Sequence, residues 1–129
     1  MIARWLAILT IVILLLAFAW HADPLAPSPP AITLSLSHSV SPQPASFRAR
    51  VQIQPHPDNR WWCVVFDGPE YKRSCRELEG VGSPRTFTVW FNNLSGGEYA
   101  AVAELYRVTE GEPKTIRSAL VRFQVIGLF

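Results

Sequence analysis

Two cysteines are the residues of this sequence whose spacing points most clearly to chemistry. Cys63 and Cys75 stand twelve positions apart, with Pro69 midway between them. If 61–67 and 71–77 pair as an antiparallel hairpin around this proline, Cys63 lies opposite Cys75 at a Cα separation of about 4.5 Å, which suits a bridge. We therefore predict a Cys63–Cys75 disulfide. Two free buried thiols or a redox pair are the alternatives, and the second is disfavoured because redox pairs usually have the spacing C-x-x-C.

The histidines are not grouped as a metal site. His21 falls at the boundary of an N-terminal apolar run, His38 at the end of a strand-like segment and His56 in a proline-flanked loop. Asp58 is near enough in sequence to share a metal with His56, but two ligands do not make a site. We predict no metal site and no cofactor.

Catalytic motifs are also absent from the sequence. It contains no G-x-S-x-G, no H-E-x-x-H and no phosphate-binding glycine loop. Glu77 and Glu79 share one face of a predicted strand, where a solvated charge pair is more plausible than a glycosidase dyad. Small one-domain sandwiches, the architecture derived below, are seldom enzymes. We therefore predict no catalytic residues and no enzymatic activity.

Length and composition predict one folded domain. The 129 residues are 49% hydrophobic and 17% charged, which allows a packed core. Twelve Lys and Arg against ten Asp and Glu give a net charge of +2. This near balance argues against a nucleic-acid-binding protein that works by a clustered basic surface.

The N-terminus has the layout of an export leader. After Arg4, the run 5–20 carries no charge, and small residues permit cleavage after Ala19 or Ala22. Residues 1–22 are thus a signal peptide or an uncleaved membrane anchor, although sixteen helical residues rise only about 24 Å. A buried helix of the domain is a weaker alternative. Under either main interpretation the remainder is extracytoplasmic: periplasmic, secreted or anchored outside.

The rest of the chain reads as a linker and a domain of strands. Residues 23–31 form a proline-rich linker, and 32–129 form the domain. Alternating apolar and polar residues, separated by turn signals, predict strands rather than helices. The alanines of 98–107 also fit a helix, but the preceding Gly pair favours a strand. The seven predicted strands are 32–37, 47–54, 61–67, 71–78, 86–91, 98–107 and 116–126.

The turn segment 94–99 resembles a motif of known β-sandwich domains. Leu94, Gly97 and Tyr99 are similar to the tyrosine corner of immunoglobulin-like and fibronectin type III-like domains, in which the Tyr hydroxyl bonds to upstream backbone. Trp62-x-Val64-x-Phe66 resembles an inward strand of the fibronectin group. The resemblance implies an all-β, seven-stranded immunoglobulin-like sandwich after the N-terminal hydrophobic helix. Its inter-sheet disulfide is not carried over, because Ala49 or Val51 and Ala101 occupy those positions.

These features predict a non-catalytic extracytoplasmic binding or scaffold module. Side chains that alternate with the predicted core residues should point outward from the sheet. Several of these outward residues are apolar, which makes them a candidate binding face for a protein partner. Ligand-binding loops 55–60 and 108–115 are a second possibility. A membrane-tethered structural subunit of an envelope complex is the alternative function, with membrane contact through an uncleaved N-terminal segment. The outward set comprises Trp61, Val65, Ala100, Val102, Tyr106 and Leu120.

Overall fold

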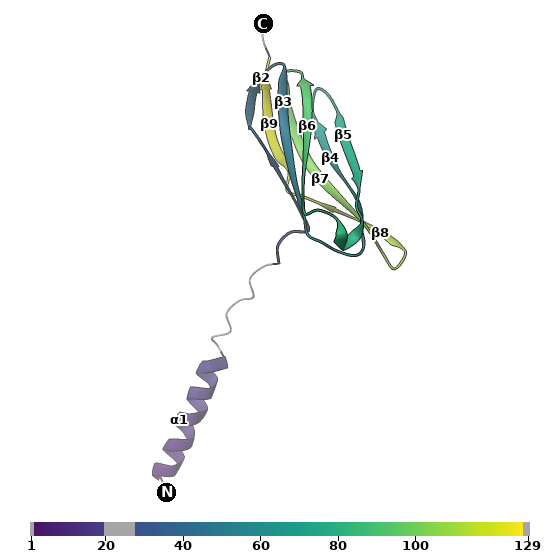
Figure 1. Cartoon of the computed structure of the whole chain (residues 1–129). Coiled ribbons are helices and arrows are strands. Elements are labelled where there is room, and N and C mark those ends of the chain that lie inside the picture. The colour runs from purple at the N-terminus through teal and green to yellow at the C-terminus, as the bar shows by residue number, and fades with distance from the viewer. Residues whose placement is uncertain (1, 20–27, 128–129) are drawn as a thin grey trace.

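The computed structural model describes residues 2–19 and 28–127, which form one α-helix, one 3-10 turn and nine strands (Figure 1). The protein is therefore mostly β with one N-terminal helix. In chain order the elements are α1 (Ile2–Ala19), β1 (Ile32–Leu36), β2 (Val40–Pro42), β3 (Ala45–Ile53), β4 (Asn59–Asp67), β5 (Lys72–Glu77), η1 (Gly80–Gly82), β6 (Thr86–Leu94), β7 (Gly97–Thr109), β8 (Glu112–Arg117) and β9 (Val121–Ile126).

The strands build two sheets. One has three strands in the order β1-β3-β6, and the other has six, in the order β2-β9-β7-β4-β5 with β8 paired to β7. β2 and β9 are parallel, and the other strand pairs in the described ranges are antiparallel. The core lies between the sheets and draws buried side chains from both.

Side-chain alternation explains how the core forms. Every second residue of β3 is buried, from Ala45 to Ile53. On the opposite sheet, Trp62, Val64 and Phe66 of β4 are fully buried. Because successive strand residues point to opposite faces, this leaves the residues between them on the outer side of the sheet.

The structure has nine strands where the sequence predicted seven. The short β2 was missed, since three residues show no period. The predicted strand 116–126 is divided into β8 and β9 by Ser118–Leu120. At this break the Ser118 hydroxyl oxygen accepts a hydrogen bond of 2.9 Å from the Ala103 amide, so a side chain replaces a backbone ladder partner.

The segment 108–115 was predicted to be a loop and is a β-hairpin. β7 continues to Thr109 and pairs with β8, with Val108 opposite Pro113. The turn places Glu110 and Gly111 at positive φ angles of 52° and 79°, a two-residue arrangement that suits the twist of a hairpin. Charged residues and a proline hid these strands from period-two analysis.

The leader is helical from Ile2 to Ala19, but the membrane-spanning helix that the anchor interpretation predicted is not found among the described residues. The side chains of residues 2–14 are exposed, with Trp5 at 74%, and none belongs to the core. Within the part of the chain that is described, no helix is both long and apolar enough to cross a membrane. Ala19, the first predicted cleavage position, is the last described residue of α1. The second position, Ala22, lies outside the described residues, as do His21 and most of the linker 23–31.

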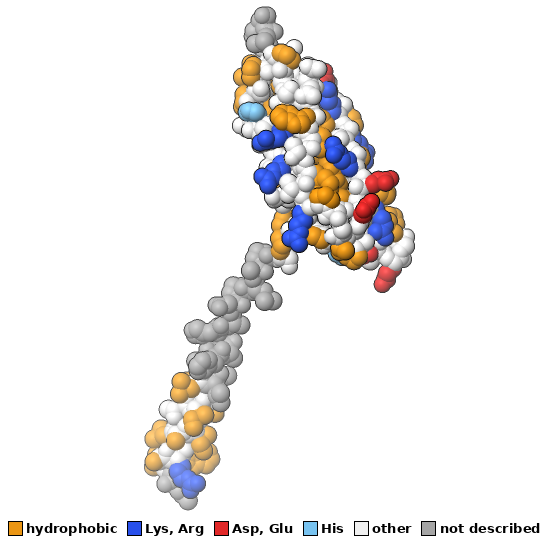
Figure 2. All heavy atoms as spheres, viewed as in Figure 1, with side chains coloured by type: hydrophobic (Ala, Val, Ile, Leu, Met, Phe, Trp, Pro, Cys, Tyr) orange, Lys and Arg blue, Asp and Glu red, His pale blue; other side chains and the backbone are white. Residues whose placement is uncertain are grey.

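Figure 2 shows one face of the molecule in the orientation of Figure 1. On the face in view, Lys and Arg side chains alternate with hydrophobic ones rather than forming one basic area. Trp90 of β6 is 59% exposed, and its ring lies 6.0 Å from the guanidinium carbon of Arg48. This Trp–Arg pair belongs to the three-stranded sheet, opposite the features described next.

Candidate functional site

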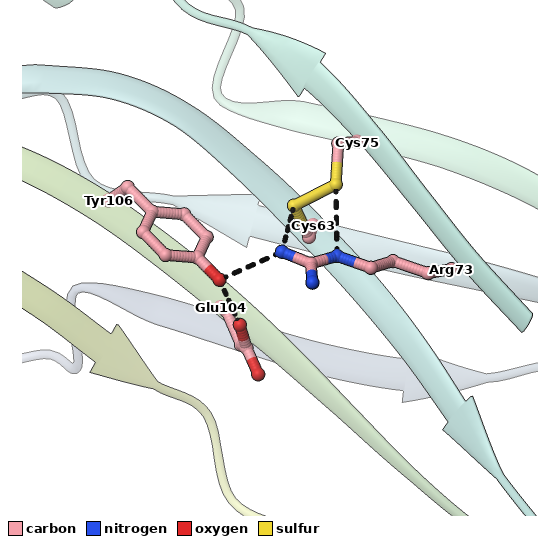
Figure 3. The surroundings of a disulfide bond; sticks show 5 residues. All are labelled: Cys63, Arg73, Cys75, Glu104 and Tyr106. Carbon is pink, nitrogen blue, oxygen red and sulfur yellow. Dashed lines mark hydrogen bonds between the residues drawn. A yellow bond between two sulfur atoms is a disulfide. The ribbon is translucent and has the colours of Figure 1, made fainter. Parts of the chain in front are cut away.

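The disulfide lies on the outer side of the six-stranded sheet (Figure 3). Cys63 of β4 is the register partner of Cys75 of β5, and the two sulfurs are bonded at 2.04 Å, with Cα atoms 4.0 Å apart. The predicted bridge and hairpin register are therefore confirmed. The two halves differ in accessibility, because Cys63 is fully buried whereas Cys75 is exposed.

Arg73 covers the disulfide. Its Nε lies 3.4 Å from the Cys75 sulfur and its Nη2 lies 3.5 Å from the Cys63 sulfur. Nη2 also donates a hydrogen bond of 3.0 Å to the Tyr106 hydroxyl oxygen. Because Arg73 stands two residues before Cys75 on β5, strand alternation places both on the same face. One guanidinium thus contacts both sulfurs.

Tyr106 and Glu104 complete this cluster from β7. The Tyr106 hydroxyl donates a hydrogen bond to the Glu104 carboxylate, and Arg117 of β8 lies 3.6 Å from the same carboxylate. The hydrogen bond to Glu104 and partial burial raise the pKa of Tyr106, while the charge of Arg73 opposes this rise. The phenol is therefore protonated at neutral pH and able to link the carboxylate to Arg73.

The predicted outward face is only partly exposed. Trp61 and Tyr106 are register partners, and their rings stack at 5.2 Å between centroids with 24° between planes. Trp61 is 42% exposed, but Val65 is only 8% exposed, and Val102 opposite it is half-buried. Leu120, at 53% exposure, falls between β8 and β9 rather than within a strand.

Arg73 and Glu104 were missed in the sequence because only apolar members of the face were sought. The alternation of side chains along a strand could have revealed both residues. Arg73 lies two positions from Cys75, and Glu104 lies two positions from both Val102 and Tyr106, so each shares a face with those residues.

The predicted ligand-binding loops do meet at one end of the fold. The Thr109 hydroxyl donates a hydrogen bond of 2.9 Å to the Asp58 carboxylate. Nδ1 of His56 accepts a hydrogen bond of 3.0 Å from the Asp58 amide and lies 3.8 Å from its carboxylate. His38 instead contacts the Ser37 hydroxyl. Across residues 2–19 and 28–127, no three His, Cys, Asp or Glu side chains gather as a metal-binding group.

The predicted corner residues lie together at the turn from β6 to β7. The Tyr99 hydroxyl donates a hydrogen bond of 2.8 Å to the Ser95 carbonyl, and Leu94 is fully buried. Gly97 has a φ of 145°, and a Cβ there would lie 2.3 Å from Cγ of Pro69. These residues therefore position the start of β7 and carry no chemistry of their own.

Comparison with known proteins gives a fold but no family. No protein-family model matches the sequence, and no curated protein matches it. Two solved structures of superoxide reductase (neelaredoxin) from Ignicoccus hospitalis are similar, one of them a substituted variant. The variant has a TM-score of 0.50 and 14% identity, covering 74% of this chain and 80% of its own. The other has a TM-score of 0.49 with the same identity and coverage.

The neighbour with a TM-score of 0.50 corrects two predictions. It is a superoxide reductase and not an immunoglobulin-like or fibronectin type III-like domain, so the family expected from the corner motif is wrong. The prediction that the protein is not an enzyme is also contradicted, because it rested on the rarity of catalysis in small sandwiches and the neighbour with a TM-score of 0.50 is an enzyme. At 14% identity the likeness shows the fold alone.

Proposed function

We propose that the protein is an extracytoplasmic binding module that engages a protein partner through the outward face of its six-stranded sheet. The observation that carries the proposal is the stacked pair of Trp61 and Tyr106. Trp, Tyr and Arg are the residues most enriched at the energetically important centres of protein interfaces. Here Trp61 of β4 and Tyr106 of β7 are register partners, and the side chain of Arg73 on β5 reaches the Tyr106 hydroxyl.

This pair is held in place before any partner arrives. The Tyr106 hydroxyl is fixed between Glu104 and Arg73, and the Tyr106 ring supports one face of the Trp61 indole. Ordering a side chain at an interface costs about 0.5–1.5 kcal/mol, so a preformed aromatic surface loses less entropy on binding. The disulfide and the apolar leader support an oxidising, extracytoplasmic location.

Photo-crosslinking in cells tests the binding face. A photoreactive phenylalanine analogue is placed at position 61 in one protein and, as the control, at position 90 in another. Trp90 is also an exposed tryptophan, at 59% against 42% for Trp61, but it lies on the three-stranded sheet. We expect one discrete crosslinked protein from position 61, competed by purified wild-type protein but not by a folded Trp61→Ala variant. Equal crosslinking from position 90, or crosslinking only to a second copy of the chain, would contradict the proposal.

A separate experiment tests location. A reporter fused after Pro30 is expected on the extracytoplasmic side, and deletion of residues 1–20 is expected to retain it in the cytoplasm. Mass measurement of the exported product also separates the two functions predicted from the sequence. A new N-terminus at Trp20 or Asp23 supports a cleaved, freely released module, whereas intact Met1 in the membrane fraction favours the tethered subunit. Export that does not depend on residues 1–20 would contradict the assignment of the leader.

A further inference from the structure

The two sulfurs of the disulfide differ in how an external reagent can reach them. β5 is the last strand of the six-stranded sheet, so Cys75 stands on an edge strand and is exposed. Cys63 lies on β4, between β5 and β7, and is fully buried. An incoming thiol therefore meets Cys75 first and has no comparable access to Cys63.

The charge around the disulfide favours its cleavage by a thiolate. Arg73 is within 3.5 Å of both sulfurs, and its guanidinium is cationic at any pH at which thiols react. A nearby arginine stabilises a thiolate, and a stabilised thiolate is a better leaving group in disulfide exchange. Structural disulfides have no need of a cation at both sulfurs, so this contact points to a reactive bond.

We propose that the Cys63–Cys75 disulfide is a thiol–disulfide exchange centre, which the thiolate of an external dithiol attacks at Cys75 while Arg73 stabilises the Cys63 sulfur as it leaves. This activity goes beyond the partner-binding role and does not depend on it. The exposed edge position of Cys75 supplies the access, and the guanidinium supplies the charge stabilisation.

The exchange balances in two steps. In the first, the external sulfur bonds to the Cys75 sulfur, the Cys63–Cys75 bond breaks, and its electron pair leaves on Cys63 as a thiolate beside Nη2 of Arg73. In the second, the other thiolate of the dithiol attacks the first external sulfur and releases Cys75 as a thiolate. The dithiol is oxidised by two electrons and the protein disulfide is reduced by the same two. The protons of the dithiol pass to the cysteine thiolates or to solvent.

Reduction kinetics of the full-length native chain test the role of Arg73, with dithiothreitol as the dithiol and rapid alkylation as the quench. Arg73→Met is compared with Arg76→Met, which removes the same charge from the other face of β5, without a described contact to the disulfide. We expect Arg73→Met to slow reduction about tenfold, with partial recovery in Arg73→Lys, because the leaving thiolate loses its cation. Arg76→Met should stay close to wild type.

The direction of this effect separates the proposal from a structural role. If Arg73 only holds the strands together, Arg73→Met loosens the site and reduction becomes faster. Faster reduction, or equal slowing in Arg76→Met, would overturn the proposal. Reduction that occurs only in denaturant would overturn it as well.

The site of attack is measured with a monothiol, which stops the reaction at the mixed disulfide. Lys72 and Arg73 lie between the cysteines, so trypsin places Cys63 and Cys75 in different peptides. We expect the mixed disulfide on the Cys75 peptide, with Cys63 recovered as the alkylated thiol. The reverse distribution would refute attack at the exposed edge strand.

Discussion

Arg107 donates a hydrogen bond of 2.7 Å from its Nε to the side-chain oxygen of Asn59, and Asn59 is only 1% exposed. The side-chain amide nitrogen of Asn59 in turn donates a hydrogen bond of 3.1 Å to the backbone carbonyl of Gln54. The pairing register between β4 and β7 shifts between Asn59 and Trp61. The buried amide therefore satisfies polar groups at an irregularity where the backbone ladder is interrupted.

Asn59→Ala should destabilise the fold. The substitution leaves the Gln54 carbonyl and the Arg107 guanidinium without their partner, so we expect the free energy of unfolding to fall by about 2 kcal/mol. Chemical denaturation monitored by tryptophan fluorescence measures the loss. Asn92→Ala is the matched control, because Asn92 is exposed and should lose less than about 0.5 kcal/mol. Equal effects of the two variants would show that the Asn59 contacts contribute nothing.

Tyr99→Phe removes one hydroxyl from the turn between β6 and β7. The Tyr99 hydroxyl donates a hydrogen bond of 2.8 Å to the Ser95 carbonyl. Tyr99 is buried, with only 3% of its surface exposed. We expect a loss of about 1 kcal/mol in the free energy of unfolding, the usual value for one hydrogen bond. Tyr71→Phe is the control, because Tyr71 is 62% exposed. A Tyr99→Phe protein as stable as wild type would contradict the structural role of this hydroxyl.

The strands with strong alternation were predictable from the sequence, and the weakly patterned ones were not. In β3, apolar residues alternate with polar ones, and this sequence pattern matches the burial of every second side chain. β2 and β8 are polar or very short, and they form through backbone pairing with β9 and β7. Backbone hydrogen bonds of this kind are nearly independent of side-chain type, so no residue pattern predicts these strands.

Within the candidate site, the sequence predicted the disulfide but not the side chains that contact it. The symmetry of Cys63 and Cys75 about Pro69 fixes their register, and this register carries the disulfide. The position of Arg73 over the sulfurs depends on the rotamer of a long side chain and on Tyr106 of β7, which is distant from Arg73 in the sequence. Such a contact needs the folded sheet, because it joins residues that are 33 positions apart in the sequence.

Gly97→Ala tests the close approach of two turns. Gly97 has a φ of 145°, which L residues rarely adopt, and a new Cβ would lie 2.3 Å from the Pro69 ring. We expect a loss of about 2 kcal/mol or more in the free energy of unfolding, from backbone strain together with overpacking. Gly82→Ala is the control, because a Cβ at Gly82 meets nothing within 4 Å. Similar melting temperatures for the two variants would contradict this account.

The raised pKa of Tyr106 predicts a loss of stability at high pH. The hydrogen bond to Glu104 and partial burial hold the phenol pKa above its ordinary value of 10.0. The unfolded chain then releases this proton at a lower pH than the folded chain. The contribution of Tyr106 is complete below pH 10 and is lost as the pH rises through the folded-state pKa.

Alkaline denaturation checks this prediction. The stability of wild type should fall more steeply above pH 10 than that of Tyr106→Phe, and ultraviolet difference titration of the two proteins should place the Tyr106 transition above 10.0. Arg73→Met should raise the transition further, because the charge of Arg73 lowers this pKa. A Tyr106 transition at or below 10.0 would contradict the hydrogen bond to Glu104.

Reduction of the disulfide should lower the melting temperature without changing the fold. A bridge across a short hairpin stabilises mainly by restricting the unfolded chain, with a contribution of about 2–3 kcal/mol to the free energy of unfolding. For a domain of about 100 residues this corresponds to roughly 10–20 °C. Thermal melts with and without reductant measure the shift, and circular dichroism of the reduced protein should retain the β-type spectrum.

A double variant separates the disulfide from other effects of the reductant. Cys63→Ala combined with Cys75→Ala should melt near the reduced wild type and should not respond to reductant, since no other cysteine is present. A thiol count under denaturing conditions confirms the state of each sample. Wild-type protein with no shift on reduction would leave the register of β4 and β5 intact and would refute the energetic argument, because the unfolded chain would then gain no freedom that matters to stability.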